Sequence, residues 1–176
     1  GPWSRAGAGR WTHPVPSDAA PGPLFHEGRP VPFRADLGKA EEGIAYTHDG
    51  GPITVRAPEA PDGSWRLGVV PIGIEVLGSS HVRVHDVAVT GTSLHGMHLV
   101  GCRHCRVEDV RVSGVGGILF GAPINLHLGN GIEIGKDAED VVIQGARIHD
   151  VFDTCATTQT YSSGARQRGI RFRDLD

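Results

Sequence analysis

Three stretches of this chain repeat one pattern: SSHVRVHDVAV at residues 79–89, CRHCRVEDVRV at 102–112 and AEDVVIQGARI at 138–148. The step from Val82 to Cys105 is 23 residues and the step from Cys105 to Val141 is 36 residues. We interpret the difference as extra residues that enter at one corner only. A short repeat that accepts insertions at a fixed corner is typical of proteins built from stacked strands.

A second recurring element precedes each copy at the same offset. It reads GIEV at 73–76, GMHL at 96–99 and GIEI at 131–134, and we interpret GIRF at 169–172 as the start of a fourth copy. Each repeat thus contains three short strands rich in β-branched residues. The sequence therefore predicts an all-β fold, a single-stranded parallel β-helix of about four turns.

The alternation of apolar and polar residues predicts which side chains face outward. In the leading strands every second residue is apolar and should point inward, which leaves Glu75, His98, Glu133 and Arg171 outside. Neighbouring parallel strands lie about 4.8 Å apart, so these four side chains should form one column. Long loops at 115–130 and 152–168 should wall a groove above this column, and loops on a rigid scaffold commonly carry function.

Composition supports many short strands and limits the classes of partner. The chain has 26 glycines and 12 prolines, only 6% aromatic residues and a net charge of −3. This balance gives no electrostatic reason to expect nucleic acid. No stretch approaches the roughly 20 apolar residues of a membrane-spanning helix, so we expect no membrane span.

Two regions of different character divide the chain. Residues 1–72 are rich in glycine and proline turns and predict an irregular β-rich segment. Residues 73–176 carry the repeats and should form the β-helix. The fourth turn stops at Asp176 with no visible cap, so we expect this region to be truncated, with self-association or further segments of a parent chain covering the open end.

The repeats resemble those of the right-handed parallel β-helix proteins of the pectin-lyase-like superfamily. The resemblance rests on GMHLVGC at 96–102, GNGIEIGKDA at 129–138 and VFDTCATTQ at 151–159. The last stretch is similar to a loop written aromatic-Asp-Thr-Gly-hydrophobic-Thr-Asn-Gln in bacterial members, with Cys155 and Thr158 replacing its glycine and asparagine. The resemblance implies a carbohydrate-binding or sugar-cleaving protein that acts outside the cell or at its surface.

Two carboxylates make hydrolysis of a polysaccharide the first hypothesis. Glycosidases place two carboxyl groups across the scissile bond, and Glu133 on the groove floor with Asp153 on the wall could form such a pair, with His98 beside them. Alternatively, Glu133 is one rung of a charge ladder between His98 and Arg171. The remaining groove residues are expected to bind the sugar: Glu75, His95, Asn130, Gln159, Tyr161, Arg168 and Arg171.

Two other functions stay open. A polysaccharide lyase needs a cation to neutralise a sugar carboxylate and a base to remove a proton. Arg166, Arg168 or Arg171 could supply the first, and His98 or Tyr161 the second. An aspartate cluster for calcium is not evident, because Asp150 and Asp153 alone make a poor cage. The third possibility is a non-catalytic module that binds glycan or has a structural role.

Metal ligands are not suggested by the spacing. His95, His127 and His149 fall near one edge but in different loops. Cys102 and Cys105 form a C-x-x-C that could be half a zinc site with His98 or His104. In the predicted register, however, Cys105 occupies an inward position and should be a small buried apolar residue. We therefore expect neither a metal ion nor another cofactor.

Overall fold

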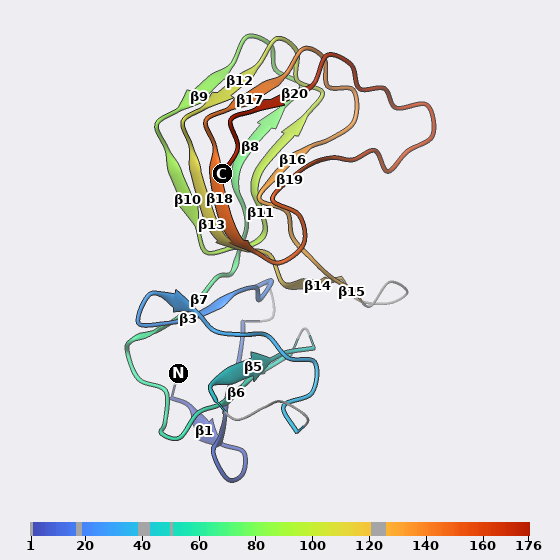
Figure 1. Ribbon diagram of the computed structural model, residues 1–176. Helices are drawn as coiled ribbons and strands as arrows, with labels where there is room; N and C mark the ends of the chain where they lie inside the picture. The colour runs from blue at the N-terminus through green and yellow to red at the C-terminus, as the bar shows by residue number, and fades with distance from the viewer. Residues whose placement is uncertain (1, 17–18, 39–42, 50, 121–125) are drawn as a thin grey trace.

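The computed structural model describes residues 2–16, 19–38, 43–49, 51–120 and 126–176. Every regular element in these ranges is a β-strand, which confirms the all-β prediction. The described residues include no helix that is long and apolar enough to cross a membrane. Two regions are visible in Figure 1: a set of parallel sheets in the upper half and the N-terminal strands below it.

The N-terminal strands form two small antiparallel sheets. One has the order β1-β2-β6-β5 and the other β4-β3-β7. A separate core fills this region, with Val55 and Ile53 almost fully buried. The strands are β1 (Ser4–Arg5), β2 (Arg10–His13), β3 (Leu24–His26), β4 (Arg29–Pro30), β5 (Ala45–Thr47), β6 (Ile53–Arg56) and β7 (Trp65–Leu67).

The repeats form three parallel sheets, which we call the parallel-sheet region. The first sheet has the order β19-β16-β11-β8, the second β20-β17-β12-β9 and the third β10-β13-β18. The first contains β8 (Val70–Leu77), β11 (Thr92–Val100), β16 (Ile132–Ile134) and β19 (Ala156–Thr158). The second contains β9 (Arg83–His85), β12 (Arg106–Glu108), β17 (Val142–Gln144) and β20 (Arg171–Arg173). The third contains β10 (Ala88–Thr90), β13 (Arg111–Val115) and β18 (Arg147–Val151).

Equivalent residues of successive repeats pair directly in each sheet. Val107 of β12 lies opposite Val84 on one side and Ile143 on the other, in the register that the repeats predict. Most of the predicted inward residues form one apolar core, whereas Phe172, which the alternation also predicts to point inward, is exposed. The fully buried members of this core include Met97, Leu99, Cys105, Val107, Val110, Val112, Ile132, Ile134, Val141, Ile143 and Ala146.

The fourth repeat differs from its prediction. The fourth strand of the first sheet is β19, whereas β20 pairs with β17 in the second sheet. The prediction that residues 169–172 begin a leading strand is therefore wrong. Extra residues also enter at two corners: the hairpin β14 (Ile118–Phe120) and β15 (Leu126–Leu128) precedes β16, and residues 159–167 follow β19.

The corners between sheets use left-handed backbone at equivalent positions. At the corner between the second and third sheets, Asp86, Asp109, Gly145 and Asp174 have φ values of 54°, 52°, 65° and 49°. Such φ values suit glycine, and Asp tolerates them better than most residues do.

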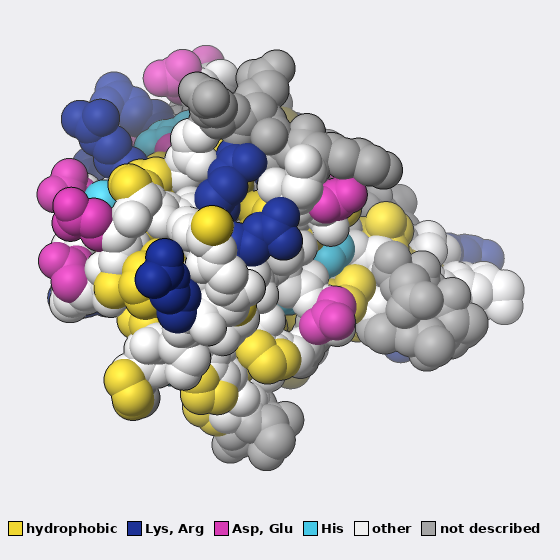
Figure 2. Space-filling view, turned by 90° about the horizontal axis from the view of Figure 1, so that it is seen from below, with side chains coloured by type: hydrophobic (Ala, Val, Ile, Leu, Met, Phe, Trp, Pro, Cys, Tyr) yellow, Lys and Arg dark blue, Asp and Glu magenta, His cyan; other side chains and the backbone are white. Residues whose placement is uncertain are grey.

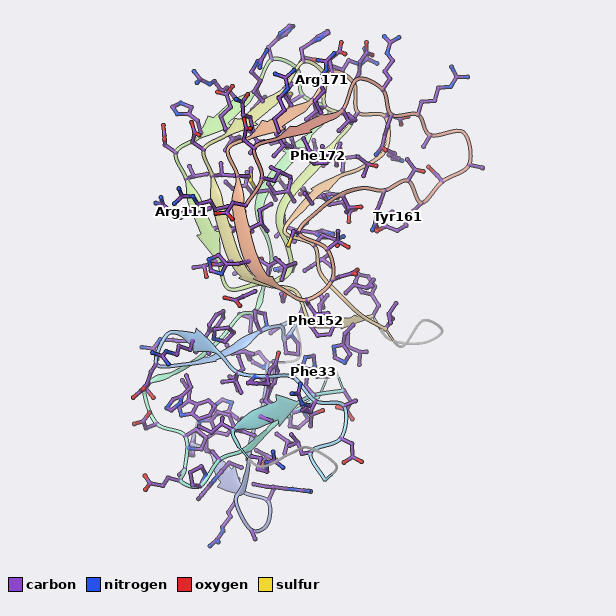
Figure 3. The ribbon with its side chains drawn as sticks, viewed as in Figure 1. Phe33, Arg111, Phe152, Tyr161, Arg171 and Phe172 are labelled. Carbon is purple, nitrogen blue, oxygen red and sulfur yellow. The ribbon has the colours of Figure 1, made fainter. Side chains whose placement is uncertain are left out.

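Aromatic and histidine rings join the N-terminal region to the parallel-sheet region. The ring of Phe33 lies 4.4 Å from that of His127 and 5.8 Å from that of Phe152. Figure 3 shows Phe33 and Phe152 meeting between the two regions. The two parts thus share an apolar junction. Figure 2, seen from the N-terminal side, shows described cationic, anionic and apolar side chains interspersed over that face.

Candidate functional site

The first parallel sheet places three polar side chains of the predicted column in register. His98 of β11 pairs with Glu75 of β8 on one side and with Glu133 of β16 on the other. The fourth position belongs to Thr157 of β19. The column Glu75, His98, Glu133 is therefore confirmed, and its predicted fourth member is wrong.

Arg171 belongs to the second sheet, opposite Val142. Figure 3 shows it on β20, away from the loop that carries Tyr161. The difference arises because β19 already fills the fourth position of the first sheet. The loop that follows β19 then leads into β20, which joins the second sheet. A charge ladder that runs from His98 through Glu133 to Arg171 is consequently not formed.

Glu133 is a buried carboxylate. Its exposed fraction is 1%, although the sequence predicts an open position on a groove floor. Asn130 Nδ2 donates a hydrogen bond of 2.7 Å to Glu133 Oε2, and Asn130 Oδ1 accepts one of 3.2 Å from the Thr154 backbone. The Asn130 side chain therefore holds the carboxylate and the following loop together.

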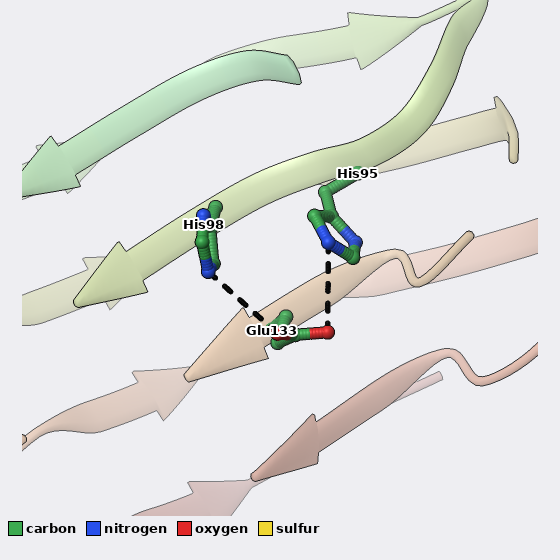
Figure 4. A group of neighbouring side chains, drawn as sticks. All are labelled: His95, His98 and Glu133. Carbon is green, nitrogen blue, oxygen red and sulfur yellow. Dashed lines mark ion pairs between the residues drawn. The ribbon is translucent and has the colours of Figure 1, made fainter. Parts of the chain in front are cut away.

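Two imidazole rings face this carboxylate, as Figure 4 shows. Nε2 of His95 lies 3.6 Å from Glu133 Oε2, and Nε2 of His98 lies 3.6 Å from Glu133 Oε1. Both separations exceed the 2.7–3.2 Å of an ordinary N–H···O hydrogen bond. The ring centroids of the two histidines are 5.1 Å apart. The three side chains thus surround a small gap.

The contacts of the two Nδ1 atoms indicate which nitrogen of each ring carries the proton. His98 Nδ1 lies 3.2 Å from Glu75 Oε1, and because an ionised carboxylate only accepts, a proton belongs on Nδ1. In a neutral His98 ring, Nε2 then presents a lone pair to Glu133. Two lone-pair atoms facing each other require a positive charge between them, either a proton or a metal ion.

His95 has the opposite arrangement. The backbone N–H of Asn130 donates to His95 Nδ1 at 3.4 Å, which leaves the proton of the neutral ring on Nε2. Burial lowers the pKa of His95 below its usual value, and the negative charge of Glu133 opposes that shift. The desolvation effect is the larger one, so the neutral ring is favoured.

A cavity of about 640 Å³ opens above these residues. One wall is apolar and comes from β11 and the β14–β15 hairpin: Leu94, Val100, Phe120, Leu126 and Leu128. The polar lining consists of His95, His98, Asn130, Glu133, Lys136, Asp153, Gln159, Tyr161 and Ser162. The cavity therefore combines a polar floor and rim with an apolar side, as ligand sites commonly do.

Most of the predicted site residues meet at this cavity. His95, His98, Asn130, Glu133, Asp153, Gln159 and Tyr161 all line it. The Tyr161 hydroxyl donates a hydrogen bond to Gln159 Oε1. Partial burial and the negative charge of Glu133 raise the pKa of Tyr161. Asp153 is exposed at the rim and Glu133 is buried beneath it.

Three predicted ligand-binding residues lie outside the lining. Glu75 contacts the cavity only through His98. Arg168 forms an ion pair with Glu139, and neither residue lines the cavity. Arg171 is on the second sheet, as described above. Among the described lining residues the cation is Lys136, for which the sequence predicts no role in the site.

The apolar wall was also missed from the sequence. Leu94 and Val100 belong to β11, which is longer than the predicted leading strand and starts at Thr92. Leu126 and Leu128 were assigned only to a wall loop, and the hairpin pairing that turns them toward the cavity is a tertiary feature. Residues 121–125 of the predicted wall lie outside the described residues.

The cysteines do not contribute to this site. Cys102 and Cys105 are 0% and 1% exposed and belong to the apolar core. Within the described ranges, the Cys102 and Cys105 thiols form no potential metal-ligand group with either His98 or His104, so the structure does not support the half-zinc hypothesis. The expectation of a buried apolar Cys105 is confirmed. His127 contacts Gly117 O and His149 contacts Asp150, so neither joins His95.

A potential metal-ligand group does exist in the described part of the chain. His95, His98 and Glu133 each offer one ligand atom, and these atoms lie within 4.8 Å of one another.

No protein-family model matches this chain, and no curated protein or solved structure shows significant similarity to it.

Proposed function

We propose that the parallel-sheet region is a right-handed parallel β-helix. Three parallel sheets visited in a constant order, with equivalent residues in direct register, support this proposal. Crossovers between parallel strands are right-handed in nearly all known sheets. The first sheet then serves as a rigid platform for chemistry on its outer face.

We further propose that the cavity is the active site of an enzyme that cleaves glycosidic bonds in a polysaccharide or oligosaccharide. The observation that carries this proposal is the pairing of two carboxylates at one cavity: Glu133 buried at its floor and Asp153 exposed at its rim. Hydrolysis by acid and base groups is the first candidate reaction. Such substrates would place the protein outside the cell or at its surface.

Burial assigns different roles to the groups. Asp153 is exposed, reaches a ligand directly and, as a carboxylate, would accept a proton from the attacking water. His98 is partly exposed and lies between the carboxylates Glu75 and Glu133, which would stabilise its imidazolium, so His98 would donate a proton to the leaving oxygen. Glu133 would thus act electrostatically from below and not by direct contact with the water.

Elimination is the second candidate, and Lys136 favours it. A lyase must neutralise a sugar carboxylate, and Lys136 brings a cation to the cavity in place of the arginines that the sequence suggests. His98 or Tyr161 would then remove the proton next to the carboxylate. The two reactions differ in product, because only elimination leaves a conjugated double bond.

The test compares cleavage by the natural chain with that of Glu133→Gln and Asp153→Asn variants over a panel of neutral and acidic polysaccharides. We expect each variant to lose roughly 10²–10⁴-fold in kcat while substrate binding persists. Asp150→Asn is the matched control, since Asp150 is an exposed aspartate outside the cavity that contacts His149. Reducing-end release reports both reactions, and ultraviolet absorbance of an unsaturated product reports elimination. Binding of a glycan without turnover would overturn the enzymatic proposal and support a binding module.

A further inference from the structure

We propose that His95, His98 and Glu133 bind one first-row divalent transition-metal ion, such as Zn²⁺, at the floor of the cavity. The two histidines come from β11 and the carboxylate from the adjacent β16. The inference goes beyond the proposed reaction and does not depend on it, because ion binding can be measured without any substrate.

The distances within the group fit an ion better than direct hydrogen bonds. Each Nε2 atom lies 3.6 Å from a Glu133 oxygen. A tetrahedral ion with bonds of about 2.1 Å holds its ligand atoms about 3.4 Å apart. A hydrogen bond would require the same atoms to approach within about 3.2 Å. The two 3.6 Å distances run to different oxygens of Glu133, and one donor atom from each of the three residues lies within 4.8 Å of the others, so the group must contract toward about 3.4 Å to hold an ion.

The surroundings of His98 match those of a metal ligand. Its Nδ1 faces the Glu75 carboxylate at 3.2 Å, and Nε2 faces Glu133. Histidine ligands commonly donate their second N–H to a carboxylate in this way, which fixes the ring and makes the ligating nitrogen more basic. Glu75 is thus a positioning residue for the ion site.

Glu133 is a buried carboxyl group without a lysine or arginine partner among the described residues. It is 1% exposed. The neutral Asn130 amide donates a hydrogen bond to it. A carboxylate enclosed in this way is expected to be paired with a cation. A divalent ion between the three side chains would supply that charge.

His95 must change its protonation to bind. Its Nε2 carries the proton while Nδ1 accepts from the Asn130 N–H, so ligation moves the proton to Nδ1 and gives up that contact. At 3.4 Å the contact is a weak hydrogen bond, and its loss is a small obstacle.

The donor set selects the type of ion. Two imidazole nitrogens and one carboxylate suit Zn²⁺, Fe²⁺, Co²⁺ or Ni²⁺, whereas Ca²⁺ and Mg²⁺ prefer six or more oxygens. Three protein ligands leave at least one position for water, and the cavity lies on that side. With the ion bound, Glu133 would act as a ligand and Asp153 would remain the carboxylate that exchanges protons.

Titration calorimetry of the full chain with ZnCl₂, and absorption spectroscopy with CoCl₂, test the site. We expect one ion per chain and a cobalt spectrum of nitrogen and oxygen ligands without a thiolate charge-transfer band. His98→Gln and Glu133→Gln should each weaken the affinity by more than about tenfold, and Glu75→Gln by about 10–100-fold. His149→Gln is the control, because His149 is an exposed histidine beside Asp150, and it should leave the affinity unchanged.

Three outcomes would overturn the proposal. The first is the absence of saturable binding of either ion to the natural chain. The second is unchanged affinity in the His98→Gln variant, whose partly exposed side chain makes it the variant best able to fold; circular dichroism verifies the fold. The third is a thiolate band, which would place the ion at a cysteine, either the buried Cys102 and Cys105 or the exposed Cys155. A chain that binds the ion but cleaves no glycan would support this site while contradicting the proposed reaction.

Discussion

At the scale of single residues, the glycine that opens each leading strand shows how closely the sheets approach one another. A Cβ atom added at Gly131 would lie 2.4 Å from Cys155 O and 2.5 Å from Ile148 Cγ2. Gly73 and Gly96 have the same kind of neighbours, a third-sheet valine and the backbone of the next repeat. The recurring glycine in the sequence therefore marks a steric requirement where the first sheet packs against side chains of the third.

The first stability prediction concerns this position. We expect Gly131→Ala to lower the free energy of unfolding by about 1–3 kcal/mol, because backbone atoms cannot move aside as a flexible side chain can. Gly63→Ala is the control, since nothing lies within 4 Å of a Cβ there. Urea unfolding measures both variants. Equal stability of the two would show that the repeats are less tightly packed than their spacing indicates.

At the scale of elements, the corner between β12 and β13 depends on a left-handed residue. Asp109 has a φ of 52° and its N–H donates to Gln144 O of the next repeat at 3.0 Å. We expect Asp109→Ala to cost about 1–2 kcal/mol of unfolding free energy and Asp109→Gly to cost less, because glycine adopts this conformation without steric conflict. Urea unfolding of both variants makes the test, and a ranking with alanine above glycine would contradict it.

The elements also show why some strands could be predicted and one could not. The second and third strands of each repeat alternate valine or isoleucine with polar residues, so both their existence and their facing follow from the sequence. The strand β19 reads Ala156-Thr157-Thr158 and has no strongly apolar position. Pairing with β16 places β19 in the first sheet. The apparent leading strand at 169–172 leads into β20, which follows β19 in the chain and pairs with β17 in the second sheet.

The alignment of the site residues along the first sheet could be predicted from the sequence. The residues that enclose the site could not. Register follows from repetition, so His98 between Glu75 and Glu133 could be predicted. The burial of Glu133 and the apolar wall depend on Asn130, the β14–β15 hairpin and the loop of Tyr161, which meet only in three dimensions. Sequence spacing carries no information on such contacts between distant loops.

At the scale of the whole molecule, the junction between the two regions contains a buried titratable ring. His48 is 4% exposed, and neither of its ring nitrogens makes a hydrogen bond. It lies between the rings of Phe33 and His127, at 5.7 Å and 4.8 Å. Burial, together with the positive charge available to His127, lowers the pKa of His48 to about 4, and Asp49 opposes the shift.

This shift makes the junction acid-sensitive. The unfolded chain binds a proton at His48 near pH 6.5 while the folded chain stays neutral until about pH 4, so the unfolded state holds more protons between these values. The stabilising effect of the neutral ring is fully present above pH 6.5 and is lost as the pH falls toward 4. The change amounts to at most about 3.5 kcal/mol at about 1.4 kcal/mol per pH unit.

Urea unfolding of the natural chain and of a His48→Phe variant, measured from pH 7.5 to pH 4, isolates this contribution. Phenylalanine keeps an aromatic ring at the junction and cannot titrate, so the stability of the variant should fall less steeply over this range. His95, whose pKa is also lowered by burial, adds a slope of the same sign to both proteins and cancels in the comparison. Identical pH slopes in the two proteins would mean that His48 is hydrated or already protonated in the folded chain, and that the two regions are not held together by a neutral, apolar junction.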